Sequence, residues 1–229
     1  MPANSVSFIY RNKYNTFLEV RISQYADDLI VFTDTTLTSV KGALEDISYF
    51  SEISGLSINI EKTKCMPIGK EHAIFLHDSS IGIQFVDEIK ILGILFNPKN
   101  DNITALNMEN ILQSLPKQIA QWKRRNLTLI GKITVIKSLI LSRFVHLFLA
   151  LPNPSATLIK RLNSLLYRFI WNSADKVKRS RLTQNYGRDG LQMVEVSSFI
   201  QSLKASWLQR LGKSDSIWAK IAKCASTCK

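Results

Sequence analysis

The spacing of apolar residues along the chain changes near residue 104. Before that point apolar residues come in short runs: Val20 and Ile22 alternate with polar neighbours, and residues 29–32 (Leu-Ile-Val-Phe) form a continuous β-prone run. From Thr104 onward, apolar residues recur every three or four positions, which is the period of an amphipathic helix. The pattern predicts an α+β part followed by an all-helical part.

The first part predicts strand, helix, strand and hairpin. A tight turn at Ala26-Asp27 would join two short strands, and Gly55 is placed to stop the helix that follows. Asp34 or Thr35 is available as the N-cap of that helix. Its apolar face would pack across the sheet, and it consists of Leu37, Val40, Leu44 and Ile47. Further strands are expected at Ile58–Ile60, 81–85 and 90–96.

The second part predicts several helices with clear ends. Pro116 should kink or split the first of them. A long helix over 127–151 should end at Pro152, and Asn153 then offers an N-cap with Pro154 in the first turn of the next helix. A last helix should run over 198–211. The first helix has an apolar row at Met108, Ile111, Leu115, Ile119 and Trp122; the third has Leu158, Leu162, Leu165 and Phe169 on one face and Lys160, Arg161, Ser164 and Arg168 on the other.

Charge divides the chain as sharply as periodicity does. The net charge is +12, but residues 1–110 carry nine Lys/Arg against fourteen Asp/Glu, a net of −5. Residues 111–229 carry twenty-one against four, a net of +17. Lysine and arginine that neutralise phosphates supply most non-specific affinity for nucleic acid. The second half therefore predicts a nucleic-acid-binding surface, with an ordinary basic solvent face as the alternative.

Cysteine content and hydropathy limit the class of protein. Three cysteines, Cys65, Cys224 and Cys228, indicate a reduced intracellular protein, nuclear or cytoplasmic, and we interpret the last two as free thiols. Hydrophobic content of 45% is typical of a globular protein. No apolar run opens the chain, so we expect no secretory signal. Lysines and an arginine interrupt the most hydrophobic segment, 127–151, so we expect no membrane span there.

Two adjacent carboxylates, Asp27 and Asp28, are the main candidates for chemistry. They follow Tyr25-Ala26 at the expected turn. Like charges this close repel one another unless a cation neutralises them, and hard oxygen ligands suit Mg²⁺. A solvated acidic turn is the alternative, because Asp is a favoured turn residue.

Several short motifs follow that hairpin in a fixed order. They are residues 54–59 (Ser-Gly-Leu-Ser-Ile-Asn) with Lys62 and Lys64, residues 89–94 (Ile-Lys-Ile-Leu-Gly-Ile), Trp122, residues 127–133 and residues 169–171 (Phe-Ile-Trp). In this order and spacing the chain resembles, over roughly residues 15–210, the reverse transcriptase of LINE-type non-LTR retrotransposons. The resemblance implies a partial palm over 1–103, an antiparallel sheet with a packed helix. It also implies a helical thumb over 104–174, followed by a basic linker and C-terminal helical segment over 175–229.

The resemblance also implies roles for individual residues. Asp27 and Asp28 would hold Mg²⁺ in the intact enzyme, and Lys64, or Lys62, would lie near the departing pyrophosphate as a catalytic cation. Tyr25 would lie along the minor groove at the primer end, and Gly93 would belong to the hairpin that grips the primer. For these residues the alternatives are a strand aromatic, surface lysines and a simple bulge. The basic residues expected to bind nucleic acid are Lys123, Arg124, Arg125, Arg161, Arg168, Lys178, Arg179 and Arg181.

One ligand expected for the family is absent from the sequence before the hairpin. Glu19 is the sole carboxylate in the first 26 residues, whereas the second palm carboxylate of the family lies on an upstream strand. We therefore expect the C-terminal half of an RNA-directed DNA polymerase, inactive alone, that acts on an RNA template, a DNA primer and deoxynucleoside triphosphates together with a missing half-palm and fingers. The alternatives are a non-catalytic nucleic-acid-binding module and a host protein that kept the helices as a scaffold.

Overall fold

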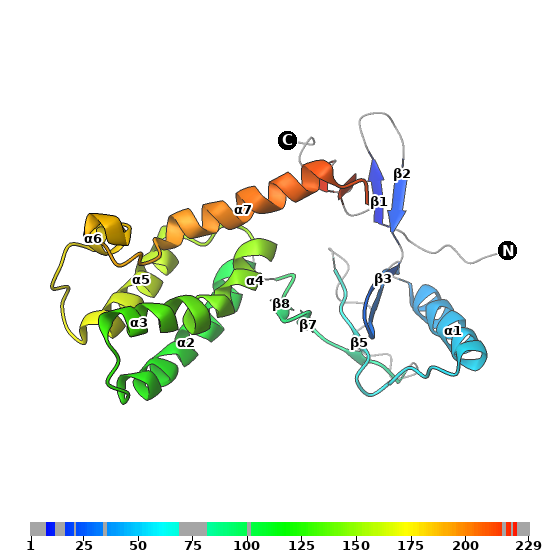
Figure 1. Cartoon of the computed structure of the whole chain (residues 1–229). Coiled ribbons are helices and arrows are strands. Elements are labelled where there is room, and N and C mark those ends of the chain that lie inside the picture. Colours follow the sequence, from blue (N-terminus) through cyan, green and yellow to red (C-terminus); the bar gives the residue numbers. More distant parts are fainter. Residues whose placement is uncertain are drawn as a thin grey trace. The chain divides into compact units, whose positions relative to one another are not determined.

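The structure is a computed structural model that describes residues 8–11, 17–20, 22–33, 36–68, 82–99, 102–216, 219–220 and 222–223 (Figure 1). The chain divides into two compact units. The N-terminal unit comprises Met1–Ile89, Asn97–Lys99 and Ser214–Lys229, and the helical unit comprises Lys90–Phe96 and Asn100–Lys213. The predicted mixture of α and β structure is confirmed. The domain boundaries expected at residues 103 and 174 remain predictions.

The strands of the N-terminal unit form separate pairs. Strand β1 (Phe8–Arg11) pairs antiparallel with β2 (Phe17–Val20), and β3 (Ile22–Tyr25) pairs antiparallel with β4 (Asp28–Val31). Strands β5 (Lys64–Cys65) and β6 (Gln84–Phe85) pair in parallel. Within the described residues no sheet exceeds two strands. The single antiparallel sheet expected from the sequence is therefore not present in this part of the chain.

The strand expected at Ile58–Ile60 is wrong, and the side chain of Asn59 explains why. Its Oδ1 accepts a hydrogen bond from the Lys62 backbone N–H at 3.1 Å, and its carbonyl oxygen accepts from the backbone N–H of Thr63 at 3.0 Å and from the Thr63 hydroxyl at 2.8 Å. Asn side chains that bond nearby backbone compete with strand formation. The segment turns here, and the strand starts at Lys64 instead.

Helix α1 (Leu37–Ser54) matches its predicted end and its predicted face. Gly55 has a φ of 73° and donates its N–H to the Ser51 carbonyl, which is a left-handed C-cap. The N-cap is Thr36, whose hydroxyl accepts from the Ser39 N–H; the expected caps Asp34 and Thr35 lie outside the described residues. The predicted apolar face is half-buried, yet no residue of α1 is fully buried. The predicted close packing of this helix across a sheet is therefore not seen.

The helical unit begins with a short hairpin and a long helix. Strands β7 (Ile89–Ile91) and β8 (Ile94–Phe96) pair across the turn Leu92-Gly93, as the sequence predicted. Helix α2 (Ile103–Lys123) runs through Pro116 without splitting, so the predicted split is not seen, and a kink at Pro116 stays a prediction. Its buried residues include Met108, Leu112, Leu115 and Ile119, which confirms the predicted apolar row except that Leu112 is fully buried and Ile111 only partly.

The predicted long helix over 127–151 is instead bent. It consists of α3 (Leu129–Val135), a π-helical turn η2 (Ile136–Ile140) and α4 (Ser142–Ala150). The bend lies at Leu141, where the two arms, Leu129–Ile140 and Ser142–Ala150, meet at 44°. No single helix in the described ranges is long and apolar enough to cross a membrane, although the two arms together meet that test by length and composition. Ile136, Ile140 and Phe144 are fully buried in the protein core, in keeping with the predicted buried helix.

Four further elements follow, and the helices share one core. Helix α5 (Ala156–Trp171) begins at N-cap Ser155, two residues later than expected, and its predicted polar face is exposed. After α6 (Arg179–Leu182) and a 3₁₀ turn η3 (Tyr186–Arg188), helix α7 (Val196–Lys213) continues through Gly212. Helix α2 packs against α4 and α5, and α4 packs against α7. The core is centred on Phe144, Phe148, Leu162, Leu166, Phe169 and Ile170.

Candidate metal and nucleic-acid sites

The acidic hairpin has the geometry that the sequence predicted. Tyr25 pairs with Asp28, so Ala26 and Asp27 form the two-residue turn at its tip. Ala26 has a φ of 53°, a left-handed conformation that costs a non-glycine residue roughly 1 kcal/mol. The Gln24 side-chain amide donates to the Ala26 carbonyl at 3.2 Å and so supports the turn. The sequence holds this backbone in a strained form at the position where the two carboxylates lie.

The oxygen atoms at this tip are of the kind that binds Mg²⁺, but two carboxylates are too few to complete a two-ion site. Asp27 and Asp28 are exposed, and their carboxylate oxygens are the hard ligands that Mg²⁺ prefers. Two ions about 4 Å apart, as in polymerases, need further oxygen ligands around them. Among the described residues, no group of three or more His, Cys, Asp or Glu side chains gathers in one place. The described part of the hairpin can therefore contribute to a metal site but does not complete one.

The other residues expected near the chemistry are accessible. Tyr25 has 68% of its surface exposed, so it does not serve as a buried strand aromatic. Lys64 is exposed on β5, and Lys62 is exposed in the turn that Asn59 stabilises. A catalytic role for either lysine stays a prediction.

Gly93 lies in a turn that is fixed to helix α2. Leu92 and Gly93 have φ values of 47° and 85°, and a Cβ built on Gly93 would lie 3.7 Å from His146 Nε2 of α4. The buried Asn107 of α2 accepts from the Leu95 N–H and donates to the Leu95 carbonyl, both at 2.8 Å. Its amide also donates to the Ile103 carbonyl at 2.9 Å. One side chain therefore bonds the free edge of β8 as a neighbouring strand would.

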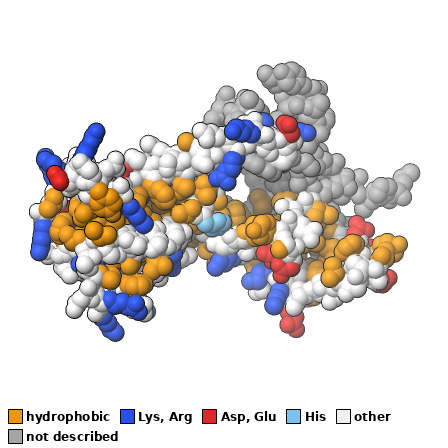
Figure 2. Space-filling model, in the orientation of Figure 1, with side chains coloured by type: hydrophobic (Ala, Val, Ile, Leu, Met, Phe, Trp, Pro, Cys, Tyr) orange, Lys and Arg blue, Asp and Glu red, His pale blue; other side chains and the backbone are white. Residues whose placement is uncertain are grey.

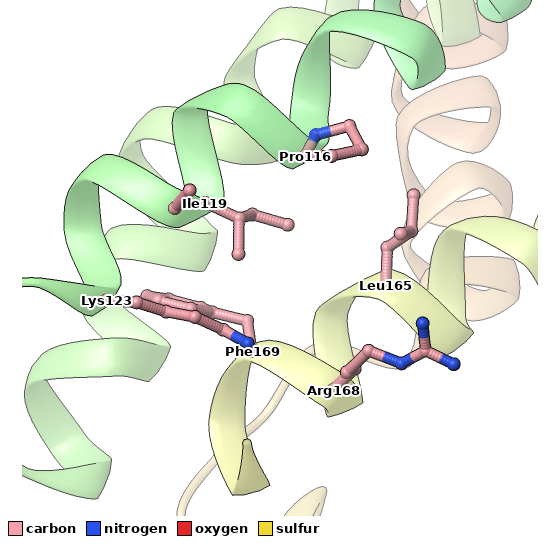
Figure 3. A pocket seen from close by; sticks show the side chains of 7 residues that line it. Pro116, Ile119, Lys123, Leu165, Arg168 and Phe169 are labelled. Carbon is pink, nitrogen blue, oxygen red and sulfur yellow. The ribbon is translucent and has the colours of Figure 1, made fainter. Parts of the chain in front are cut away.

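A hollow with a basic rim opens between α2 and α5 (Figure 3). Its walls are apolar, with Pro116 and Ile119 from α2 and Leu165 from α5. Lys123 and Arg168, one from each helix, also line it. Both side chains are exposed, and neither forms an ion pair with a described residue. Two cations beside an open seam can receive the phosphates of a nucleic-acid backbone.

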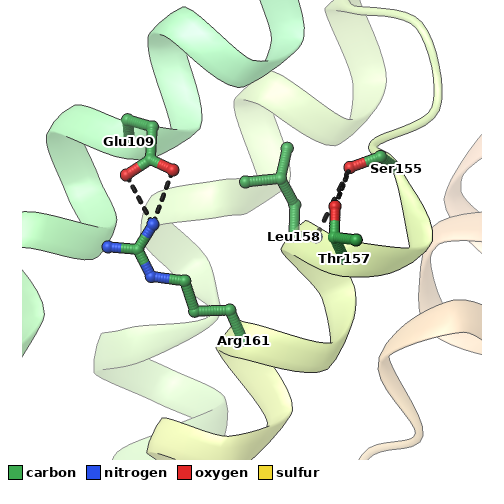
Figure 4. A network of polar contacts seen from close by, with 5 residues as sticks. All are labelled: Glu109, Ser155, Thr157, Leu158 and Arg161. Atoms are coloured by element: carbon green, nitrogen blue, oxygen red, sulfur yellow. Dashed lines mark hydrogen bonds and ion pairs between the residues drawn. The ribbon is translucent and has the colours of Figure 1, made fainter.

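Arg161 lies on the same exposed face of α5 as Arg168, two turns earlier, but its charge is already compensated. Its Nη1 contacts both carboxylate oxygens of Glu109 on α2, at 2.6 and 2.7 Å (Figure 4). The pair is about half exposed, so its contribution to stability is small. Its importance here is electrostatic, because this end of the α2–α5 seam is close to neutral and the Lys123–Arg168 end is positive.

The remaining cations that we expect to bind nucleic acid fall into two groups, those with an intramolecular partner and those without one among the described residues. Arg125 stacks over the Trp122 ring at 4.7 Å, and Arg179 stacks over the Tyr167 ring at 4.3 Å while its Nε donates to Asp175 at 2.7 Å. Burial raises the pKa of Tyr167, and the nearby Arg179 charge opposes that rise. Arg124, Lys178 and Arg181 are exposed and have no such intramolecular partner in the described ranges. Figure 2 shows many Lys and Arg side chains over the helices and few acids.

Sequence reasoning missed two residues that shape these sites. Asn107 has no motif to mark it, although a polar residue directly before Met108 on an otherwise apolar face is a signal of a buried hydrogen-bonding side chain. Arg188, an exposed residue of η3, was not among the basic residues expected to bind nucleic acid. Cys224 and Cys228 lie outside the described residues.

The acidic hairpin, the β5–β6 pair and the β7–β8 hairpin all lie within one segment of the sequence that matches a known family. Residues 3–96 match the family model for reverse transcriptase (RNA-dependent DNA polymerase), which supports a reverse-transcriptase-like polymerase domain in this part of the chain.

Proposed function

We propose that the protein is part of an RNA-directed DNA polymerase of the non-LTR, LINE-type class. Asp27 and Asp28 contribute ligands to its Mg²⁺ site, and the helical unit binds the template–primer. The observation that carries the proposal is the acidic tip itself, an exposed pair of carboxylates on a strained two-residue turn within the segment that matches the family. Bound Mg²⁺ would supply charge stabilisation at the phosphates of the incoming nucleotide.

The chain by itself is proposed to be inactive in primer extension. Positioning of the reacting groups supplies much of the rate of such reactions, and it depends on both ions being held. The described residues bring only Asp27 and Asp28 together, so a further carboxylate must come from elsewhere. We propose that this carboxylate belongs to an upstream palm strand carried on another part of the enzyme.

A primer-extension assay tests both statements. The purified chain is incubated with an RNA template, a DNA primer, deoxynucleoside triphosphates and Mg²⁺, with Asp27→Ala as the control for contaminating polymerase. We expect no synthesis by the chain alone, and synthesis when a fingers and upstream-palm fragment is added as a second polypeptide. Synthesis by the chain alone that disappears in Asp27→Ala would contradict the proposed inactivity and would show that another carboxylate, such as Glu19, completes the site.

A second candidate function, a non-catalytic nucleic-acid-binding module, is favoured by the +17 net charge of residues 111–229. Binding is measured by fluorescence anisotropy of a labelled duplex at increasing salt. If five phosphates are neutralised, log affinity falls against log salt with a slope of roughly −3.5 to −4.5. A salt-independent affinity would contradict phosphate binding in either candidate. Binding without any Asp27-dependent synthesis, even with the second polypeptide, favours the module.

The α2–α5 seam offers charge-matched variants for this assay. The double variant Lys123→Gln/Arg168→Gln removes two uncompensated charges, and we expect the salt slope to become shallower by about 1.5 to 2. Lys41→Gln/Lys213→Gln removes the same net charge from exposed positions outside the hollow. Glu109→Gln/Arg161→Gln removes the ion pair without changing net charge. Equal losses in the first two variants would contradict a binding role for the hollow.

A further inference from the structure

The loop between α6 and α7 is closed at its base by a ladder of backbone hydrogen bonds. The Leu182 carbonyl accepts from the N–H groups of Leu191 at 3.2 Å and Met193 at 2.8 Å. The Gln184 carbonyl accepts from the Gln192 N–H at 2.9 Å. Leu182 and Met193 are both buried in the core of the helical unit. We call residues 178–193 the basic knob; its base is fixed to the core at two points.

Close contacts around Gly190 restrict the backbone conformation at the tip of the knob. A Cβ on Gly190 would lie 2.0 Å from the Gln184 carbonyl oxygen, so no other residue fits there without a backbone shift. The Gly190 N–H donates to the Asn185 carbonyl at 3.1 Å, and Asp189 and Gln192 on either side have φ values of 57° and 52°. A loop held in this way loses little conformational entropy when a ligand binds to it.

The knob displays one aromatic ring among several cations. Tyr186 is 52% exposed, and Lys178, Arg181 and Arg188 are exposed around it in the sequence. Asp189 is the one acid of the knob. None of the three cations forms an ion pair with a described residue.

In the same region, Tyr167 and Arg179 give a contrast, because each of them already has an intramolecular partner. Tyr167 is 4% exposed and is covered by Arg179, whose guanidinium also contacts Asp175. Tyr186 has a free surface, and burial in the core does not account for it. The exposed ring and cations are therefore accessible to a ligand from solution.

We propose that the basic knob binds single-stranded nucleic acid, with one unpaired base stacked on Tyr186 and the flanking phosphates held by Arg181 and Arg188. An exposed aromatic ring and cations are the two elements that single-strand-binding surfaces combine, because every unpaired base presents a face for stacking. In a duplex the bases are stacked on one another and present no such face. The proposal deepens the proposed function, because it names the form of nucleic acid that this surface selects.

The test is fluorescence anisotropy of the full chain with a labelled 12-nucleotide oligo-dT and, separately, with a 12-base-pair duplex. Tyr186→Ala is expected to weaken oligo-dT binding by about 5- to 100-fold, the range for loss of one stacked base. It should leave duplex binding within about twofold, because duplex affinity comes from phosphate contacts. Tyr186→Phe keeps the ring and should bind oligo-dT as the unmodified chain does.

Three further variants keep the test decisive. Tyr186→Leu retains an apolar side chain without the ring and should lose single-strand affinity as Tyr186→Ala does, which guards against an effect of folding. Arg181→Gln/Arg188→Gln should make the oligo-dT salt slope shallower by about 1.4. Tyr49→Ala removes a tyrosine of α1 that is 67% exposed and should have no effect.

Two results would overturn the proposal. One is oligo-dT binding within twofold of the unmodified chain in both Tyr186→Ala and Tyr186→Leu. The other is an equal loss in Tyr49→Ala, which would show that any exposed tyrosine contributes in the same way. In either case unchanged duplex binding with its steep salt slope would leave the proposed function intact, whereas loss of that slope would contradict the proposed function itself.

Discussion

The hydrogen bonds of Asn107 give the helical unit its most direct test. Asn107→Ala removes three hydrogen bonds of 2.8 to 2.9 Å and leaves the N–H and carbonyl of Leu95 without their partner. A buried backbone group that loses its partner costs about 1–3 kcal/mol, and Leu95 is half-buried, so the lower end applies to each of the two groups. Alanine recovers up to about 0.7 kcal/mol through its better helix propensity. The expected net loss of unfolding free energy is therefore about 1.3 to 2 kcal/mol.

Urea denaturation followed by tryptophan fluorescence measures this loss. With a denaturant slope of about 2 kcal/mol/M, the midpoint should fall by about 0.6 to 1 M. Asn110→Ala is the matched control, because it makes the same change at an exposed position of α2 and should raise stability by up to about 0.7 kcal/mol through helix propensity alone. Asn107→Asp keeps an acceptor for the Leu95 N–H, but it buries a charged carboxylate against the Leu95 and Ile103 carbonyl oxygens, so at neutral pH it should destabilise at least as much as Asn107→Ala.

Hydrogen exchange separates a local effect from a global one. The Leu95 amide should exchange faster in Asn107→Ala than in the control, since its acceptor is the Asn107 side chain. A midpoint shift equal to that of Asn110→Ala, with unchanged exchange at Leu95, would refute the account of Asn107 as the residue that holds β8 on α2. It would also remove the physical link between Gly93 in the hairpin turn and the helices.

Three other predictions follow from single side chains. Burial raises the pKa of Glu195, but hydrogen bonds from the Ser198 and Ser197 N–H groups outweigh it and lower that pKa, so the stability it gives is present above the usual glutamate pKa and is lost as pH falls through the lowered value. Thermal melts of Glu195→Gln from pH 7 to 3 should therefore lack part of this acid-induced decline. Gly190→Ala should cost about 2 kcal/mol or more in urea denaturation, whereas Gly187→Ala, where a Cβ meets nothing within 4 Å, should not show this overpacking cost. Asp27→Asn should leave the melting temperature unchanged or slightly raised without Mg²⁺, because it removes repulsion with Asp28; a large loss would show that the carboxylate is structural.

The sequence predicted elements best where a local signal determines them. The turn at Ala26-Asp27, the C-cap at Gly55 and the hairpin at Gly93 all depend on a few adjacent residues, and all three are present. The errors have a common cause. Asn59 turns the chain away from a strand through its own side chain. The helix over 127–151 bends at Leu141, directly after a π-helical turn, with no proline or glycine there to mark the bend.

Packing across the sheet was predicted for α1 from the same periodicity that succeeded for α2. The two helices differ in the elements that surround them. The α2 row finds partners on α4 and α5 and becomes fully buried, whereas the α1 face finds too little apolar surface among the described residues. Figure 1 shows that only short strand pairs are described in the N-terminal unit, and a two-stranded pair offers little surface to cover. Periodicity predicts which face of a helix is apolar, and the surrounding elements determine whether that face becomes buried.

The candidate binding residues show the same limit for charge. The sequence predicts the total charge but not which charges are compensated in the folded chain. Net charge is a sum over residues, so it predicted that the basic half binds polyanions, but it treats Arg161 and Arg168 alike. They differ because Glu109, fifty-two residues before Arg161, lies across the α2–α5 seam and compensates one of them. Arg179 is likewise held by Asp175 and Tyr167. Phosphate contacts release counterions at full strength only from cations that no internal acid already neutralises. The binding surface should therefore follow the uncompensated cations rather than the density of Lys and Arg along the sequence, and these are Lys123, Arg124, Arg168, Lys178, Arg181 and Arg188.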